Sequence, residues 1–337
     1  MKNIDMKKTG LKKTGLGLLA VTLFASCINT RHSAPVAAGL APGQASTVGY
    51  SVNTFHSTFS NDVDVGNAKP SGIHWFVDRW FGAKATHGDH LGFPSGGGIT
   101  LNDGGDAANY TIGSAAQSRS AASHWVGSAF GGGGYFEAVI QFDTTPVTAP
   151  GAEGFPAWWL EPIEHMADPK ADIWPGQPPG YENFTEVDIF EYNQWKQHGA
   201  NVYSGAVHNW YGIYKQTCPQ FCRVSNINNL SRFNNYLIQV PANTDYGQPH
   251  KYAVLWVPAT NSAPGYLQYF FDDKPVSDRV SWSKFTNQAP PPGQAPWTFG
   301  VVDTQHLVLI LGTGTNQPMT VRSVDVWQAS DAQNIHN

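Results

Sequence analysis

Charged side chains are scarce in this sequence, where Lys, Arg, Asp and Glu together make up 13% of the 337 residues. Basic residues are the scarcer sign, 20 against 25 acidic ones, and residues 1–26 hold five lysines and one aspartate. Without that segment, 15 basic and 24 acidic residues remain, a formal charge of −9. An acidic chain cannot neutralise many phosphates, so nucleic acid and anionic membrane surfaces are poor partners for it.

Runs with the periodicity of a helix are also few. The 35 glycines and 23 prolines instead separate many short apolar segments, a pattern typical of strands and turns. Hydrophobic residues make up 41% and aromatic residues 13% of the chain, enough to bury a full core. We therefore predict one large all-β domain rather than two small ones.

The apolar run near the N-terminus is short. Residues 16–25 follow a lysine-rich start, and ten apolar-biased residues are too few to span a bilayer as a helix. This pattern predicts an export signal in residues 1–26. The run ends in Leu-Phe-Ala-Ser-Cys, similar to a bacterial lipoprotein cleavage box, with Cys27 as the residue that would carry the lipid. Ordinary secretion, with cleavage here or near residues 36–38, is the alternative.

Cysteine is rare too, with three in the chain. Apart from Cys27, the pair Cys218 and Cys222 would close a small loop, which outside the cell predicts a structural disulfide. A metal pair is the alternative, but no Cys-Cys or His-His set nearby supports it. His87 and His90 stand in a Gly-rich loop, where such histidines are more often exposed than bound to metal. We predict no catalytic metal.

The rest of the chain divides by composition. Residues 27–47 are rich in Ala, Pro, Gly and Ser and are interpreted as a tether. The folded domain is expected over residues 48–330, followed by a tail at 331–337. The four glycines at 131–134 lack the lysine and the helix start of a phosphate-binding loop, and lead instead into an alternating strand at 135–142.

Three acids fall within six positions of the β-favouring run at residues 185–192. Alternation along a strand places Glu186 and Asp188 on one face. Strict alternation would then send Glu191 toward the core, where an unpaired carboxylate is costly. One extra residue at positions 189–190, a β-bulge, would return Glu191 to the face of the other two acids.

Two glutamates on one strand can lie about 5–5.5 Å apart, the separation that a retaining glycosidase needs. An aspartate between them can hydrogen-bond the nucleophile and keep the protonation states of the pair apart. A solvated acidic strand is the plainer interpretation of the same residues.

The run Glu-Val-Asp-Ile-Phe-Glu at 186–191 resembles the bulged signature of family 16 glycoside hydrolases, which include laminarinases, agarases and carrageenases. Other stretches that are similar to the family, in order along the chain, are residues 134–138, 155–162, 250–256 and 320–328. The resemblance implies an antiparallel β-sandwich jelly roll of the concanavalin A-like type, with a substrate cleft on its concave sheet.

The resemblance also implies roles for the acids. Glu186 would be the nucleophile, Glu191 the acid and base, and Asp188 the residue that orients Glu186 and helps to keep Glu191 protonated. Trp159 would line the sugar site, and His208 would approach the carboxylates from the neighbouring strand. A packed tryptophan and a core histidine are the structural alternatives for these two.

Some positions depart from the family pattern. Phe155 stands where a tryptophan is usual, and Trp195 stands where a small or basic residue is common. Trp195 is therefore a candidate stacking platform. Some relatives hold a structural calcium with an aspartate at the position of Asp325, but with one candidate ligand visible a calcium site stays open. The chemistry itself needs no cofactor.

The predicted function is that of a retaining endo-glycoside hydrolase on a β-linked polysaccharide, in an exported monomer that is either lipid-anchored at the bacterial envelope or secreted. The acidic balance and the motif favour a neutral β-1,3-glucan, and agar-type galactans share the motif. A transglycosylase uses the same residues. A non-catalytic carbohydrate-binding sandwich is the rival of another class, although such a protein has no need for both glutamates.

Overall fold

A computed structural model describes residues 39–77, 90–105, 110–117, 125–148, 154–167, 181–193, 195–213, 230–286 and 299–337. The chain divides into residues 1–37 and a compact unit of residues 38–337. The predicted export signal, Cys27 and the pair Cys218 and Cys222 lie outside the described residues, so their predictions stay predictions.

Two large sheets carry most of the described strands. The nine-stranded sheet runs β16 (Lys274–Pro275), β15 (Gly265–Phe271), β14 (His250–Val257), β9 (Gly134–Gln141), β19 (Met319–Gln328), β5 (Ile99–Leu101) and β4 (Leu91–Gly92), with β1 (Val52–Ser57) paired to β19 and β17 (Val280–Trp282) paired to β15. The eight-stranded sheet runs β13 (Leu230–Gln239), β12 (Val202–Ile213), β11 (Tyr181–Glu191), β10 (Ala157–Pro162), β18 (Leu307–Thr313), β6 (Tyr110–Gly113), β3 (Trp75–Phe76) and β2 (Val63–Asp64). Neighbouring strands are antiparallel except β2 and β3, which are parallel.

The remaining elements are small. A third sheet joins β20 (Ile335–His336), β8 (Trp125–Ala129) and β7 (Ala115–Gln117). The helices are α1 (Gly43–Ser46), α2 (Thr144–Thr148), α3 (Ile163–Ala167), α4 (Trp195–His198) and the 3₁₀ helix η2 (Phe299–Thr304). Within the described ranges, no helix has the length and apolar character needed to cross a membrane.

Side-chain alternation explains how the strands pack. On β9, Phe136, Ala138 and Ile140 have no exposed surface and join the main core, as the alternating pattern predicted. The apolar run of β18 is buried at every position. Its odd-numbered leucines enter the main core, while Val308 and Ile310 pack on the other face with residues of the third sheet. Burying each such side chain stabilises the fold by about 1.5–3 kcal/mol.

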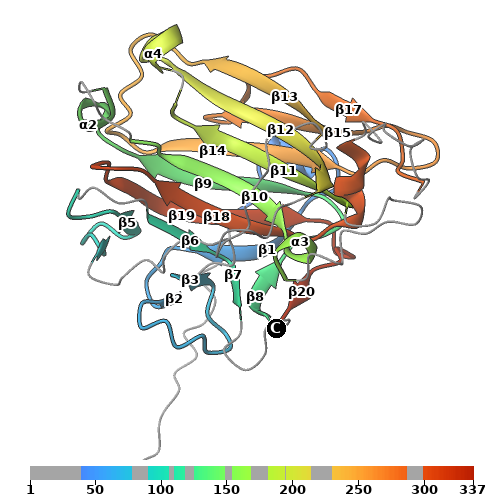
Figure 1. Ribbon diagram of the computed structural model, residues 1–337, viewed down its shortest axis with the longest axis horizontal. Helices are drawn as coiled ribbons and strands as arrows, with labels where there is room; N and C mark the ends of the chain where they lie inside the picture. The colour runs from blue at the N-terminus through green and yellow to red at the C-terminus, as the bar shows by residue number, and fades with distance from the viewer. Residues whose placement is uncertain are drawn as a thin grey trace, which may run out of the picture. The chain divides into compact units, whose positions relative to one another are not determined.

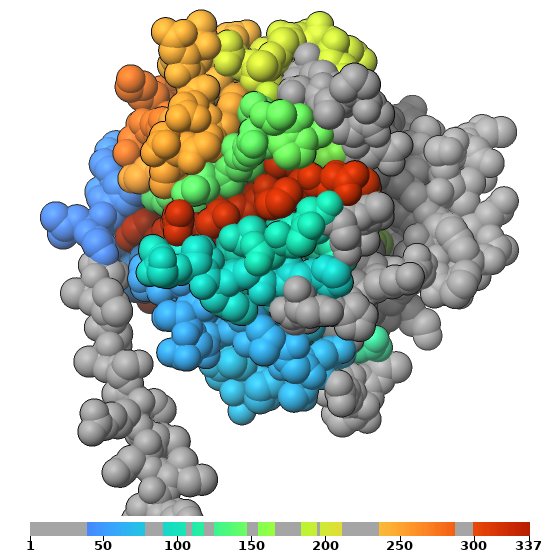
Figure 2. All heavy atoms as spheres, turned by 90° about the vertical axis from the view of Figure 1, so that its left-hand side faces the viewer, coloured from blue at the N-terminus to red at the C-terminus, as the bar shows by residue number. Residues whose placement is uncertain are grey.

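The main core lies between the two large sheets (Figure 1). Phe190 of β11 meets Tyr252 of β14 with 4.2 Å between ring centroids, which joins one sheet to the other. The predicted antiparallel β-sandwich of jelly-roll type is therefore confirmed. The chain reaches this arrangement through long crossovers. Figure 2 shows the C-terminal strands in red between green and teal segments, because β19 lies between β9 and β5, and β18 lies between β10 and β6.

Packing at the N-terminal side begins before the expected boundary at residue 48. Ala45 of α1 and Tyr50 are buried in a second cluster on the outer face of the nine-stranded sheet. The amide of Gln44 donates to Tyr135 Oη at 2.7 Å, and Tyr50 Oη donates to the carbonyl oxygen of Trp256 at 2.9 Å. Part of the Pro- and Gly-rich segment therefore belongs to the folded unit.

Candidate active site

The predicted β-bulge is present in β11. Asp188 pairs with Ala206 and Glu191 with Ser204, so three steps on β11 correspond to two steps on β12. The register with β10 shifts at the same place, where the partners of Trp158 and Trp159 are Phe190 and Asp188. One residue of β11 is therefore extra to both neighbours.

The bulge separates apolar from acidic side chains. Val187, Ile189, Phe190 and Tyr192 are at most 1% exposed and belong to the main core. The acids are not members of that core, and Glu186 and Glu191 keep partial exposure while Asp188 is 4% exposed. Glu191 consequently avoids the interior position that strict alternation would impose.

Two rings from β12 contact the acids. His208, the partner of Glu186 in the strand register, places Nε2 at 3.0 Å from Asp188 Oδ2. Trp210 Nε1 donates a hydrogen bond to Glu186 Oε2 at 2.7 Å. The two rings stack on each other, with centroids 5.0 Å apart and planes 13° from parallel. A hydrogen bond to a charged group typically contributes about 1.5–3 kcal/mol.

The carboxyl group of Glu191 has a raised pKa. Burial disfavours its charged form, and the negative charges of Asp188 and Glu186 add to the effect, which raises the pKa of Glu191 to about 9. His208 and the hydroxyl of Ser204 act in the opposite direction without cancelling the rise. The Glu191 side chain therefore carries a proton at neutral pH.

The tryptophan pair of β10 divides between the two faces of the sheet. Trp158 has no exposed surface and lies in the main core, while Trp159 is partly buried on the face of Asp188. Gly312 of β18 makes room for this indole, because a Cβ at that position would lie 2.9 Å from Trp159 Cη2 and 2.8 Å from Thr111 Cγ2. The two indoles therefore lie on opposite faces of the sheet, and the role of Trp159 in lining a sugar site stays a prediction.

The strand partners of Glu191 have small side chains. Its partners across the sheet are Ala157 on β10 and Ser204 on β12. At the same end of the sheet, Leu237 opposite Ser204 is 46% exposed, and Phe155 just before β10 is 38% exposed. Leu237 and Phe155 therefore present apolar surface at this end of the sheet.

Before Glu186 on β11, the short helix α3 packs against the strand through a histidine. His165 of α3 stacks on Phe184, with ring centroids 3.5 Å apart, and is 2% exposed. Glu164 accepts a hydrogen bond from the backbone N–H of His306 at 3.0 Å, which ties α3 to the start of β18. The sequence alone did not predict these contacts of α3.

The remaining site predictions have mixed outcomes. The backbone of Trp195 begins α4, but its side chain lies outside what the structure describes, so its role as a stacking platform stays a prediction. Trp210 was missed as a partner of Glu186. The available signal was its place on the face of His208, two residues further along the same strand.

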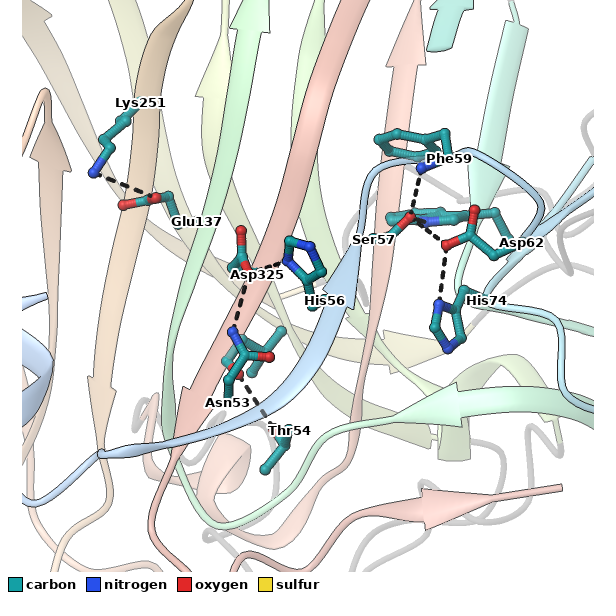
Figure 3. A network of polar contacts seen from close by, with 12 residues as sticks. Asn53, Thr54, His56, Ser57, Phe59, Asp62, His74, Glu137, Lys251 and Asp325 are labelled. Carbon is teal, nitrogen blue, oxygen red and sulfur yellow. Dashed lines mark hydrogen bonds and ion pairs between the residues drawn. The ribbon is translucent and has the colours of Figure 1, made fainter. Parts of the chain in front are cut away.

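Asp325 lies far from these acids in the topology, on β19 of the nine-stranded sheet. Its carboxylate accepts a hydrogen bond from Asn53 Nδ2 at 3.0 Å and lies 2.7 Å from His56 Nδ1 (Figure 3). Figure 3 also shows the contact between Lys251 and Glu137 at 3.7 Å. Among the residues that the structure describes, no group of three or more His, Cys, Asp or Glu side chains is placed to hold a metal ion.

No protein-family model matches this chain, and a comparison with curated proteins found no relative. Solved structures with a similar fold include an endo-1,3-beta-glucanase from Streptomyces sioyaensis, at 14% identity and a TM-score of 0.46, covering 89% of this chain and 100% of that one. A laminarinase catalytic domain from Thermotoga maritima is similar at 11% identity and a TM-score of 0.43, covering 83% and 99%. A Bacteroides ovatus GH16 protein in complex with a G4G4G3G product is similar at 11% identity and a TM-score of 0.43, covering 81% and 99%. At these identities the likeness concerns the fold alone.

Proposed function

We propose that this protein is a retaining endo-glycoside hydrolase that cleaves a β-linked polysaccharide by double displacement. The observation that carries the proposal is the bulge in β11, which brings a hydrogen-bonded carboxylate, Glu186, and a protonated carboxyl, Glu191, to one face of one strand. Such a pair is what this chemistry requires. The sequence resemblance to family 16 glycoside hydrolases supports the same reaction.

In the first step, a carboxylate oxygen of Glu186 attacks the anomeric carbon and forms a glycosyl-enzyme ester. The glycosidic C–O bond breaks, and Glu191 gives its proton to the leaving oxygen. The pKa of about 9 keeps that proton available at neutral pH. Asp188, in contact with His208, supplies part of the negative charge that holds the proton on Glu191.

In the second step, Glu191 acts as a base. Esterification removes the charge of Glu186, one of the causes that raise the pKa of Glu191, so this pKa falls once the ester has formed. Glu191 takes a proton from water as the water oxygen attacks the anomeric carbon, and the ester bond to Glu186 breaks. The carboxylate and the protonated acid are then restored.

The substrate we favour is a neutral β-1,3-glucan, with an agar-type galactan as the alternative. The negative charges of Glu186 and Asp188 on the site face would repel a heavily sulfated chain. The partly buried indole of Trp159 offers a sugar a flat apolar surface beside Asp188. We further propose that the protein is exported as a monomer, by the segment at residues 1–26, with Cys27 as a lipid attachment point.

The test compares the full chain with Glu186→Gln on laminarin, mixed-linkage glucan, agarose and carrageenan, following product length and anomeric configuration. We expect the native chain to release short products of retained configuration and Glu186→Gln to be at least about 1,000-fold slower, because the amide cannot form the ester readily. Glu137→Gln is the matched control, since it removes a buried carboxyl from the opposite sheet.

Each outcome separates the candidates. Near-native cleavage by Glu186→Gln would contradict the assigned nucleophile. Binding of a polysaccharide without cleavage by the native chain would indicate a carbohydrate-binding sandwich instead. Products longer than the supplied oligosaccharide would identify a transglycosylase that uses the same residues.

A further inference from the structure

The nucleophile proposed above has an unusual partner, an indole. Trp210 Nε1 lies 2.7 Å from Glu186 Oε2, a short contact for an N–H donor. An indole N–H can donate but cannot accept, and it carries no formal charge. Trp210 therefore gives the proposed nucleophile, Glu186, a hydrogen-bond donor without adding a charge to the site.

We infer that Trp210 is a positioning residue that holds the side chain of Glu186 in place through a hydrogen-bond donor that carries no charge. The inference rests on the proposed function, because it assigns a part of the same reaction. It goes further in explaining why an uncharged donor stands at this position.

The physical argument concerns the neighbouring acid. A lysine or arginine beside Glu186 would also stabilise its negative charge. Its positive charge would act on Glu191 as well, opposing the effect of Asp188 and Glu186 and lowering the pKa of Glu191. An N–H dipole acts over a much shorter range than a full charge. The indole can thus serve the nucleophile without depriving the acid of its proton.

The surroundings of Trp210 make it a fixed donor. Its side chain is 8% exposed and stacks on the ring of His208, which in turn contacts Asp188. Both rings project from the same face of β12, whose pairing with β11 is continuous from Tyr181 to Asp188. Two carboxylates are therefore held by two stacked rings whose positions follow from the strand register.

The test is Trp210→Phe, which keeps an aromatic ring for stacking but removes the N–H. We expect kcat/KM on the preferred polysaccharide to fall by about 10- to 100-fold, the size of a lost hydrogen bond to a charged group. The loss should appear in kcat rather than in KM, because Glu186 acts in the bond-making step while the phenyl ring keeps the packing.

Trp327→Phe is the matched control. Trp327 is 5% exposed on the opposite sheet, and within the described ranges its Nε1 has no hydrogen-bond partner. The control should show a similar loss of packing, read as a change in melting temperature, with an unchanged kcat. If Trp210→Phe behaves like the control, with lower stability but an unchanged kcat, the inference is overturned.

A second measurement uses the native ring and covers the case in which Trp210→Phe does not fold. In a ¹⁵N-tryptophan spectrum of the full chain, an indole N–H bonded to a carboxylate should resonate downfield. We expect one such resonance to move upfield in Glu186→Gln, and an absence of any response would overturn the inference. An inactive native chain would instead contradict the proposed function while leaving the hydrogen bond itself testable by this spectrum.

Discussion

At Glu191, burial and the neighbouring carboxylates both raise the pKa of the side chain. The retained proton serves the proposed reaction, but the raised pKa lowers the stability of the fold at neutral pH. The folded-state pKa of about 9 lies well above that of an unfolded glutamate. The contribution of this group to stability is complete below the unfolded pKa and is lost as pH rises through the folded pKa. The free energy of unfolding therefore falls steadily between about pH 4.5 and 9.

This cost predicts that Glu191→Gln stabilises the protein. The amide is neutral at every pH, so it avoids a penalty of about 3 kcal/mol at pH 7. We expect the melting temperature at pH 7 to rise by roughly 5 °C, with a difference that vanishes near pH 4. Thermal unfolding of the native protein and of Glu191→Gln from pH 4 to 9 measures this difference in melting temperature.

The activity of Glu191→Gln should fall although its stability rises. The native kcat/KM should fall as pH rises through about 9 and Glu191 loses its proton. Glu191→Gln should be slow and should lack this alkaline limb. A melting temperature of Glu191→Gln that parallels the native one across the whole pH range would contradict the raised pKa.

At the scale of elements, the position of Trp159 depends on strands remote from it in sequence. β10 presents the indole, but Gly312 of β18 and Thr111 of β6 form the surface under it. A side chain at Gly312 would require the indole or Thr111 to move by some tenths of an ångström. β18 is therefore a support of the site, although it carries none of the acids.

Gly312→Ala should accordingly impair substrate binding more than chemistry. We expect KM to rise several-fold with a smaller change in kcat, and stability to fall by about 1–3 kcal/mol because of overpacking. Gly104→Ala is the control, since a Cβ there meets nothing within 4 Å. An unchanged KM in Gly312→Ala would show that the indole does not contribute to substrate binding.

At the scale of the whole molecule, the folded unit begins on the face opposite the acids. α1 and Tyr50 pack on the nine-stranded sheet, whereas Glu186, Asp188 and Glu191 lie on the outer side of the eight-stranded one. The acids and the first residues of the described chain therefore lie on different sheets. The proposed lipid attachment at Cys27 concerns residues before them.

The attachment predicts a change in partitioning. Expressed in a bacterium from the full sequence, the native protein should incorporate labelled fatty acid and remain in the membrane fraction. Cys27→Ser should lose the label and become soluble, and Cys218→Ser serves as the control for loss of a thiol. A native protein that carries no label and appears in the soluble exported fraction would support ordinary secretion instead.

The local pattern of the sequence was sufficient for much of this protein. Alternation and the cost of burying a charge predicted where β11 must bulge, because both depend on near neighbours in the chain. The same rule explains why the adjacent residues Trp158 and Trp159 of β10 lie on opposite faces of the sheet.

Only the tertiary structure decided which groups meet those side chains. The hydrogen bond from Trp210 to Glu186, the room that Gly312 leaves for Trp159 and the pKa of Glu191 all arise between strands. Strand register and desolvation are properties of the packed sheets, and no spacing within a single segment contains them. The sequence shows which residue types are present, whereas the contacts of these side chains and the protonation of Glu191 follow from the packing of the strands.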